Sequence, residues 1–316
     1  SGGNGMAFYT DNYLEIRNFK IYNSKVKENI KLTAVGDMHI SPIVGNDKIA
    51  PVVNQMEIED ADYNLFLGDL FDSPDDIMDK SSRQLLITML ERSAEVAPTM
   101  VILGSHDYVL ELPDKKILVY NKEFFDDISA MDNVYLLNNS TYQDENIFFM
   151  GYLQTLDYYY GNLGKTHIEN TLGFYNDIFN RNELYQNLPS NLPKIGLIHS
   201  PEYAKDEKNV ELLKDYDLLI GGHDHDGCVP FGIGNFRRGI ISPKKALFPK
   251  DVRGYRVLSS GTGLLINGGI VKIQNCAPKL LHPFNHLCPM QIDTVTLSSD
   301  KNFSESKEYV KVKRKY

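Results

Sequence analysis

Five short segments of this chain end a hydrophobic run with aspartate, histidine or both. They are VGDMH (35–39), LGD (67–69), LGSHD (103–107), LIHS (197–200) and GGHDH (221–225). Each hydrophobic run predicts a buried strand, so the polar residues are expected where strands end, which is where open α/β sheets bind ligands. Carboxylates and imidazoles that converge at such an edge suit two divalent metal ions.

The spacing within these segments indicates which side chains act together. Two pairs stand two residues apart: Asp37 with His39, and His223 with His225. In extended backbone such residues face the same side, so each pair is expected to reach one region. The two carboxylate oxygens of Asp69 can bridge two ions, and His199 adds an imidazole. Glycines are expected to let the backbone turn sharply at this edge; they are Gly36, Gly68, Gly104, Gly221 and Gly222.

The order Asp-x-His, Gly-Asp, Gly-x-His-Asp, His and Gly-His-x-His resembles the calcineurin-like metallophosphoesterase family. The resemblance covers roughly residues 31–275. It implies an α/β fold, a four-layer α/β/β/α sandwich with two mixed β-sheets. It also implies two divalent ions (Mn, Fe or Zn) and a hydroxide bridging them that attacks phosphorus in line.

The resemblance assigns roles by position. The first ion would have Asp37, His39 and His225, the second His199 and His223, and both would share Asp69. His106 matches the family histidine that contacts the substrate phosphate and assists the leaving group. Asp107 would then orient the imidazole of His106.

Ser105 departs from the family pattern. The family has asparagine there, and its side-chain carbonyl ligates the second ion. Serine is shorter and a poorer neutral ligand, so we expect a weaker second site or one completed by water, with Ser105 beside the substrate. Three interpretations stay open. One is a working phosphohydrolase that acts on a phosphodiester or a pyrophosphate, and the second is a catalytically weakened member that binds a phosphorylated ligand or partner. The third is a nuclease that uses the same metals, which the acidic charge disfavours. Retention of all the other positions favours the enzyme.

A closer resemblance involves GHDHDGCVPF (222–231), SPK (242–244) and LFP (247–249). These stretches are similar to a subgroup that includes YkuE-like and YaeI-like bacterial phosphoesterases, which are often membrane-anchored or exported. Asp226 and Cys228 replace the glycine and glutamine of that subgroup, so its substrate preference is not carried over.

The composition of the chain limits the kinds of substrate and partner that we expect. The 316 residues carry a net charge of −9, which argues against nucleic acid and leaves a phosphorylated small molecule or lipid as the expected substrate. We predict no protein partner. The three cysteines form no CxxC pair, so no disulfide framework is expected. Residues 1–5 (SGGNG) look added rather than natural, so a natural N-terminal segment is expected to have been removed. If that segment was an anchor, we expect the protein to be membrane-associated or exported. Otherwise we expect it in the cytoplasm.

Hydrophobic patterning predicts alternating strands and helices, as in a layered α/β core. The predicted strands are 13–22 (at a sheet edge), 31–36, 63–67, 99–103, 134–137, 147–151, 194–198, 218–220, 255–259, 270–274 and 291–297, with a polar turn at 138–146; the predicted helices are 49–58, 81–96 and 168–185. We expect one domain over residues 13–300, preceded by a tail at 1–12. An insertion or cap at 153–193 and a solvated basic tail at 301–316 complete this organisation.

Overall fold

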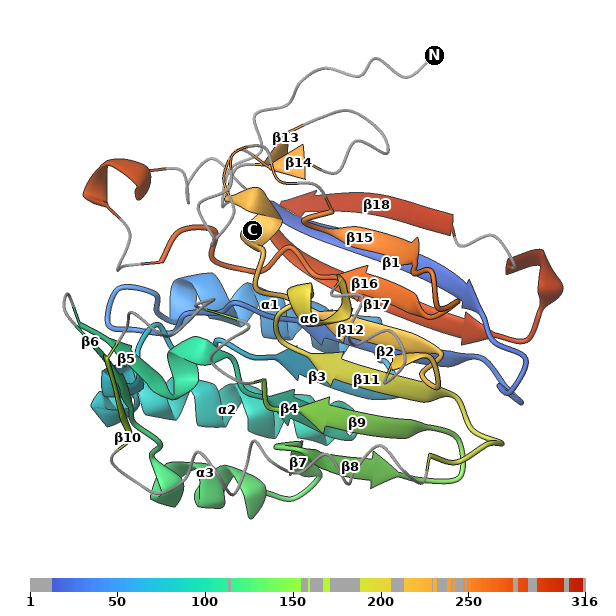
Figure 1. The fold of residues 1–316 in the computed structure, drawn as a ribbon, viewed down its shortest axis with the longest axis horizontal. Coiled ribbons are helices and arrows are strands. Elements are labelled where there is room, and N and C mark those ends of the chain that lie inside the picture. The colour runs from blue at the N-terminus through green and yellow to red at the C-terminus, as the bar shows by residue number, and fades with distance from the viewer. Residues whose placement is uncertain are drawn as a thin grey trace.

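Two β-sheets lie face to face in the computed structural model of this protein, with helices outside them (Figure 1). The structure describes residues 13–112, 115–154, 159, 167–170, 188–205, 213–228, 230–231, 238–239, 241, 247, 249, 251–274, 278–283, 289–303 and 307–314.

The first sheet has seven strands and mixed direction. Its order is β18 (Lys307–Arg314), β1 (Tyr13–Tyr22), β17 (Met290–Ser298), β2 (Ile30–Val35), β3 (Tyr63–Leu67), β4 (Thr99–Ile102) and β7 (Val134–Leu136). Strands β2, β3, β4 and β7 run parallel, whereas β17 is antiparallel to β2 and parallel to β1. Their apolar residues therefore form a sheet that is buried on both faces.

The second sheet has six strands. Its order is β15 (Gly254–Val257), β16 (Gly263–Ile266), β12 (Leu218–Gly221), β11 (Lys194–Ile198), β9 (Phe148–Tyr152) and β8 (Ser140–Gln143). The four inner strands are parallel and the two outer ones antiparallel. One core cluster fills the space between the sheets; it includes Leu32, Leu65 and Ile102 from the first and Phe149, Leu197 and Ile220 from the second.

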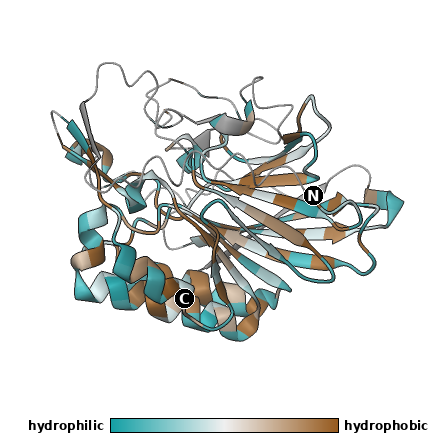
Figure 2. Ribbon diagram, turned by 60° about the horizontal axis from the view of Figure 1, so that its bottom comes forward, coloured by the Kyte–Doolittle hydropathy of each residue, from teal (hydrophilic) through white to brown (hydrophobic). Residues whose placement is uncertain are grey.

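Helices cover the outer face of the first sheet. They are α1 (Asn46–Glu59), α2 (Lys80–Val96) and α3 (Lys122–Ser129). Apolar residues such as Val52, Leu86 and Phe125 pack in one core cluster with Phe66 and Val101 of the sheet. Figure 2 shows the corresponding pattern, with mostly hydrophobic strands and helices of mixed character.

The short helix α6 (Glu202–Lys205) belongs to the layer outside the second sheet. There Ala204, Leu213 and Tyr216 form a third cluster with Leu219 and Leu264. The layers are therefore helix, sheet, sheet, helix, and the expected α/β/β/α sandwich with two mixed sheets is confirmed.

Smaller elements complete the described chain. They are the strands β5 (Val109–Glu111), β6 (Lys115–Leu118), β10 (His167–Asn170), β13 (Pro230–Phe231) and β14 (Arg238–Gly239), and the 3₁₀ turns η1 (Pro74–Met78), η2 (Ser105–Asp107), η6 (His225–Gly227), η7 (Lys279–Leu281) and η8 (Lys301–Phe303).

The expected solvated tail at residues 301–316 is wrong for its central part. Lys307–Arg314 forms β18, which pairs antiparallel with β1 along eight residues. The sequence alternates valine and lysine there, a pattern compatible with a strand at a sheet edge. As a result β1 lies inside the sheet, between β18 and β17, and not at the predicted edge.

Three further expectations differ from the structure. The predicted helix 168–185 begins inside β10, which pairs with β6, and its remainder lies outside the described residues, as does most of the expected cap at 153–193. The predicted turn 138–146 contains β8, which takes the chain into the second sheet. Residues 270–274 form no strand, while β16 at Gly263–Ile266 was not predicted.

Candidate metal centre

The polar segments meet at one end of the sandwich. Asp37, Asp69 and Ser105 follow the carboxyl ends of β2, β3 and β4 in the first sheet, and His199 and His223 follow β11 and β12 in the second. Because these strands are parallel within each sheet, each set of side chains gathers at one end of its own sheet. The two ends meet, since Asp69 of the first sheet lies in one group of potential ligands with His199 and His223 of the second. The structure therefore brings together all the aspartates and histidines that were predicted as metal ligands.

One group of potential ligands comprises Asp37, His39, Asp69 and His225, whose ligand atoms all lie within 4.8 Å of one another. His39 Nε2 lies 3.7 Å from Asp69 Oδ2, and His225 Nε2 lies 3.9 Å from Asp37 Oδ1. All four side chains are fully buried. Two carboxylates and two imidazoles in this arrangement can hold a divalent transition-metal ion.

A second group comprises Asp69, His199 and His223, again with ligand atoms within 4.8 Å of one another. His199 Nε2 lies 3.0 Å from Asp69 Oδ2. Because Asp69 belongs to both groups, its carboxylate stands where it can bridge two ions. A third grouping, of His39, Asp72 and His106, adjoins the first.

Several buried polar atoms of these groups lack a hydrogen bond of acceptable geometry among the described residues. They are His39 Nε2, Asp69 Oδ2, His199 Nε2 and His223 Nδ1. Buried polar groups without partners are costly, and here they are imidazole nitrogens and a carboxylate oxygen facing one another. The donor set therefore fits metal ions, which would supply the missing partners.

The backbone at these residues is strained. Positive φ angles occur at Asp37 (51°), His39 (46°), Asp69 (49°), His223 (69°) and His225 (48°). We expected residues two apart to face the same side because the backbone would be extended. The backbone is not extended here, so that reason is wrong. Left-handed conformations cost about 1 kcal/mol or more each for residues other than glycine, so the surrounding structure must hold them. One such restraint is the His223 N–H, which donates to both Asp37 carboxylate oxygens at 3.0 and 3.1 Å.

The glycines of the segments act mainly by allowing close approach. Of the five predicted to turn the chain, Gly68 has a positive φ (88°). At Gly104, whose φ is ordinary, a Cβ atom would stand 2.2 Å from Asp69 Oδ1 and 2.7 Å from His199 Nε2. Real Cβ contacts are not this short, so Gly104 leaves the space that the two potential ligands occupy.

Gly104→Ala is therefore expected to displace Asp69 and His199 and to weaken metal binding about 10- to 100-fold. The measurement is metal content after dialysis against defined concentrations of Mn²⁺. Gly45→Ala is the matched control, because a Cβ there meets its nearest neighbour at 3.8 Å. Equal metal content in both variants would contradict this role of Gly104.

Three of the imidazoles contact an oxygen atom through Nδ1, and their Nε2 atoms lie 3.0 to 3.9 Å from carboxylates of the ligand groups. His39 Nδ1 lies 3.0 Å from Asp72 Oδ1. The Nδ1 atoms of His199 and His225 lie 2.7 Å from Leu67 O and 2.6 Å from Val271 O. Such contacts select the tautomer and fix the ring plane of a metal-binding histidine.

The protonation of the histidines is uneven. Burial lowers the pKa of His225 to about 4 and holds that of His223 well below its usual value, so both are neutral and able to bind metal. Burial also opposes the charge on His199, but the carboxylates of Asp69 and Asp37 outweigh it and raise its pKa to about 9. A metal ion that enters the second group must therefore displace a proton from His199.

His106 lies at the open side of the centre. It is only partly buried, unlike the potential ligands, and its N–H donates to Asp69 Oδ1 at 2.9 Å. Its Nδ1 lies 2.6 Å from the backbone oxygen of Asp72, and its ring meets that of His39 edge-on at 4.7 Å. This placement leaves Nε2 as the ring nitrogen that can face a substrate.

The expected role of Asp107 in orienting His106 is wrong. Its carboxylate accepts instead from the backbone N–H groups of Phe71 at 3.0 Å and Gly104 at 2.8 Å. Asp107 thus joins the loops after β3 and β4. Ser105, also predicted as a site residue, is buried at the start of η2 between Gly104 and His106.

Two residues of the centre were missed by sequence reasoning. Asp72 contacts His39 through its carboxylate and His106 through its backbone oxygen. A signal existed, since Asp72 is a third acidic residue just after the Gly68-Asp69 segment. Gln274 places its side-chain amide 2.8 Å from His225 Nε2. Its segment was interpreted as a strand, so nothing in the pattern pointed to the centre.

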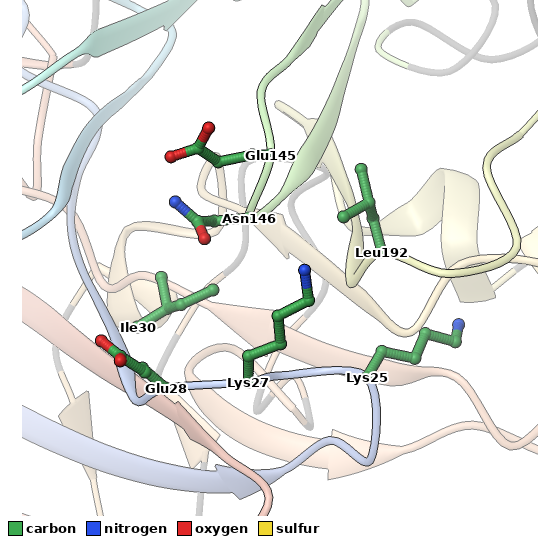
Figure 3. A pocket seen from close by; sticks show the side chains of 7 residues that line it. All are labelled: Lys25, Lys27, Glu28, Ile30, Glu145, Asn146 and Leu192. Atoms are coloured by element: carbon green, nitrogen blue, oxygen red, sulfur yellow. The ribbon is translucent and has the colours of Figure 1, made fainter.

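A small hollow lies at the other end of the sandwich (Figure 3). It is lined by Lys25, Lys27, Glu28, Ile30, Glu145, Asn146 and Leu192. These residues precede or begin β2, β9 and β11, so they stand at the amino ends of strands whose carboxyl ends face the metal centre. The hollow contains none of the predicted site residues.

A sequence model of the calcineurin-like phosphoesterase family matches residues 30–227, more than half of the chain. The chain belongs to this family. A calcineurin-like phosphoesterase is a metal-dependent hydrolase of phosphoric esters, and the two ligand groups described above lie within or next to the matched region. The family resemblance inferred from the motifs is thereby confirmed, while the bacterial subgroup stays a prediction.

This calcineurin-like phosphoesterase is also similar to a curated protein and to solved structures. A curated protein of Aquifex aeolicus (strain VF5), called an uncharacterized metallophosphoesterase, is 23% identical over 263 residues, which are 82% of this chain and 84% of that protein. The crystal structure of TT1561 of Thermus thermophilus matches 77% of this chain and 91% of its own, with 12% identity and a TM-score of 0.42. A dimetal phosphatase from Danio rerio matches 77% and 88%, with 12% identity and a TM-score of 0.37.

Among the described residues of this calcineurin-like phosphoesterase, no helix is both long and apolar enough to cross a membrane.

Proposed function

We propose that this chain hydrolyses a phosphodiester or a pyrophosphate with two divalent metal ions. The observation that carries the proposal is the pair of buried ligand groups that share Asp69. The first group would hold one ion through Asp37, His39 and His225, and the second would hold another through His199 and His223. Ions bound there supply an activated water nucleophile and neutralise charge on the phosphoryl oxygens.

The composition of the ligand groups supports manganese, iron or zinc as the metals. Each group offers at least two imidazoles together with carboxylate oxygens. Imidazole suits these transition metals, whereas magnesium and calcium favour sites made of oxygen alone.

Among the described residues, the lysines near the centre support a substrate with little negative charge at the reacting phosphorus. Lys205 lies 3.0 Å from Glu202 and 3.4 Å from Asp224, and Lys272 lies 2.9 Å from Asp226. These lysines are thus engaged with carboxylates of the protein. A diester or a pyrophosphate linkage in a small molecule or lipid asks for less additional positive charge than a dianionic monoester does.

His106 is the residue placed to act on the leaving group. The ring is only partly buried and its Nδ1 lies 2.6 Å from the Asp72 backbone oxygen, which supports Nε2 as the nitrogen that would meet the substrate. A protonated Nε2 there would donate to a phosphoryl oxygen or to the departing oxygen. Ser105, beside His106, would bind the second ion weakly or contact the substrate.

The resemblance to the YkuE-like and YaeI-like subgroup is also part of this proposal.

The test is hydrolysis of bis-p-nitrophenyl phosphate by metal-stripped full-length protein, with Mn²⁺, Fe²⁺, Zn²⁺ or Mg²⁺ added back. We expect turnover that depends on added Mn²⁺, Fe²⁺ or Zn²⁺ and exceeds turnover of p-nitrophenyl phosphate, the monoester control. Folded protein that binds two ions but hydrolyses neither compound would contradict the proposal and favour a weakened member that binds a phosphorylated ligand. Cleavage of single-stranded DNA at a higher rate would point to a nuclease.

A further inference from the structure

A lysine buried behind the metal centre has all its donors engaged. The side chain of Lys272 is 1% exposed, and its ammonium group donates to Asp226 Oδ2 at 2.9 Å, Gly268 O at 2.6 Å and Gly269 O at 2.9 Å. An ammonium group has three donors, and these bonds use them all. Lys272 is therefore placed to hold protein groups and not a substrate.

Two of the three acceptors of Lys272, Asp226 and Gly269, adjoin a residue of the first ligand group. Asp226 directly follows His225 in the chain. Gly269 has a φ of 78° and lies so close to Asp37 that a Cβ atom would stand 2.8 Å from Asp37 Oδ2. Val271, the residue before Lys272, contacts both of these ligands. Its backbone oxygen accepts from His225 Nδ1, and its N–H donates to the backbone oxygen of Asp37.

The backbone held by these contacts is strained. Asp37, His225 and Asp226 all have left-handed φ angles, of 51°, 48° and 54°. Such conformations persist only where surrounding contacts determine them. Asp226 Oδ2 bonds Lys272, whereas Asp226 Oδ1 has no hydrogen bond among the described residues and lies 3.7 Å from Arg253. Lys272 is thus the cation that fixes the orientation of the Asp226 carboxylate.

We propose that Lys272 is a positioning residue for the first metal site. Its bonds to Asp226 and to the Gly268–Gly269 backbone connect two segments. One is the loop that carries His225, and the other is the Gly268–Gly269 segment that lies against Asp37. This inference rests on the proposed two-metal function. Loss of Lys272 is expected to weaken the first ion's binding about 10- to 100-fold, as for other groups that orient metal ligands, and to leave the second ion's binding unchanged.

The experiment titrates metal-stripped full-length protein with Mn²⁺ and follows free and bound Mn²⁺ by electron paramagnetic resonance. His39→Ala and His223→Ala identify the first and second binding events. The test variants are Lys272→Met, Asp226→Asn and Lys272→Met with Asp226→Asn, each checked for folding by circular dichroism and thermal melting. The double variant removes both charges of the buried Lys272–Asp226 pair, so it is expected to fold better than Lys272→Met while keeping the weak first site.

Lys25→Met is the matched control, since Lys25 bonds both oxygens of Asp217 at 2.8 and 2.9 Å. Lys25 lines the hollow drawn in Figure 3, away from the metal centre. The Lys25→Met variant is expected to bind both ions as the wild type does. A folded Lys272→Met or double variant with both affinities unchanged, or with both lowered equally, would overturn the positioning role. Wild-type protein that binds fewer than two ions would instead contradict the proposed function.

Discussion

Asp69→Asn is expected to lower hydrolysis of bis-p-nitrophenyl phosphate by about 10²- to 10³-fold or more. Asp69 belongs to both ligand groups, and its Oδ2 lies 3.0 Å from His199 Nε2 and 3.7 Å from His39 Nε2. An amide keeps the shape of the side chain but loses its charge and one of its two acceptor oxygens. We therefore expect the variant to bind at most one ion, as measured by metal content together with kcat.

Asp126→Asn serves as the control for this prediction. Asp126 is an exposed carboxylate on α3 that pairs with Lys122, away from the centre. Its amide variant is expected to keep full activity and both ions. If Asp69→Asn were as active as this control, the assignment of Asp69 as the shared ligand would be wrong, since no other carboxylate among the described residues belongs to both ligand groups.

His106→Ala is expected to reduce kcat by about 10²- to 10⁴-fold while both ions remain bound. The partly exposed imidazole belongs to neither principal ligand group, and its contacts are to the Asp72 backbone and the His39 ring. If His106 protonates the leaving oxygen, the loss should grow with the pKa of the leaving group. The measurement is kcat for a series of aryl phosphodiesters whose phenols differ in pKa.

Metal content separates this role from a structural one. A variant that loses both ions would show that His106 supports the ligands and does not act on the substrate. A loss of kcat that is the same for every phenol would contradict proton donation, and would leave stabilisation of the phosphoryl oxygens as the role of His106.

The position of the metal centre could be predicted from the sequence because each ligand follows directly on the strand that positions it. Each ligand-bearing segment has its own apolar run, and parallel strands of one sheet, such as β2, β3 and β4, collect their carboxyl ends at one end of that sheet. The residues that support the ligands could not be predicted in this way. Lys272 and Gln274 come from a segment with no regular structure, and their contacts with Asp226 and His225 cross more than forty residues.

The prediction for residues two apart shows how a correct grouping can follow from a wrong conformation. Asp37 and His39 do share a ligand group, as the spacing suggested. Their positive φ angles, however, exclude the extended backbone on which we based that prediction. Left-handed conformations at aspartate and histidine depend on tertiary contacts, such as the bond from His223 N–H to Asp37, which no local pattern encodes. The same limit applies to β10 and β18, whose partners β6 and β1 are distant in sequence.

The order of strands in the first sheet has a consequence for folding. β1 and β2 are neighbours in the chain, yet β17 (Met290–Ser298) lies between them, and β18 adds to the far side of β1. During synthesis, β1 has neither of its partners until residues near 290 leave the ribosome. Pairing at this sequence separation is slow, because a long loop must close before any contact forms. The ligand loops after β2, β3 and β4 thus emerge long before the sheet that supports them is complete, and the nascent chain is most exposed to aggregation in this interval.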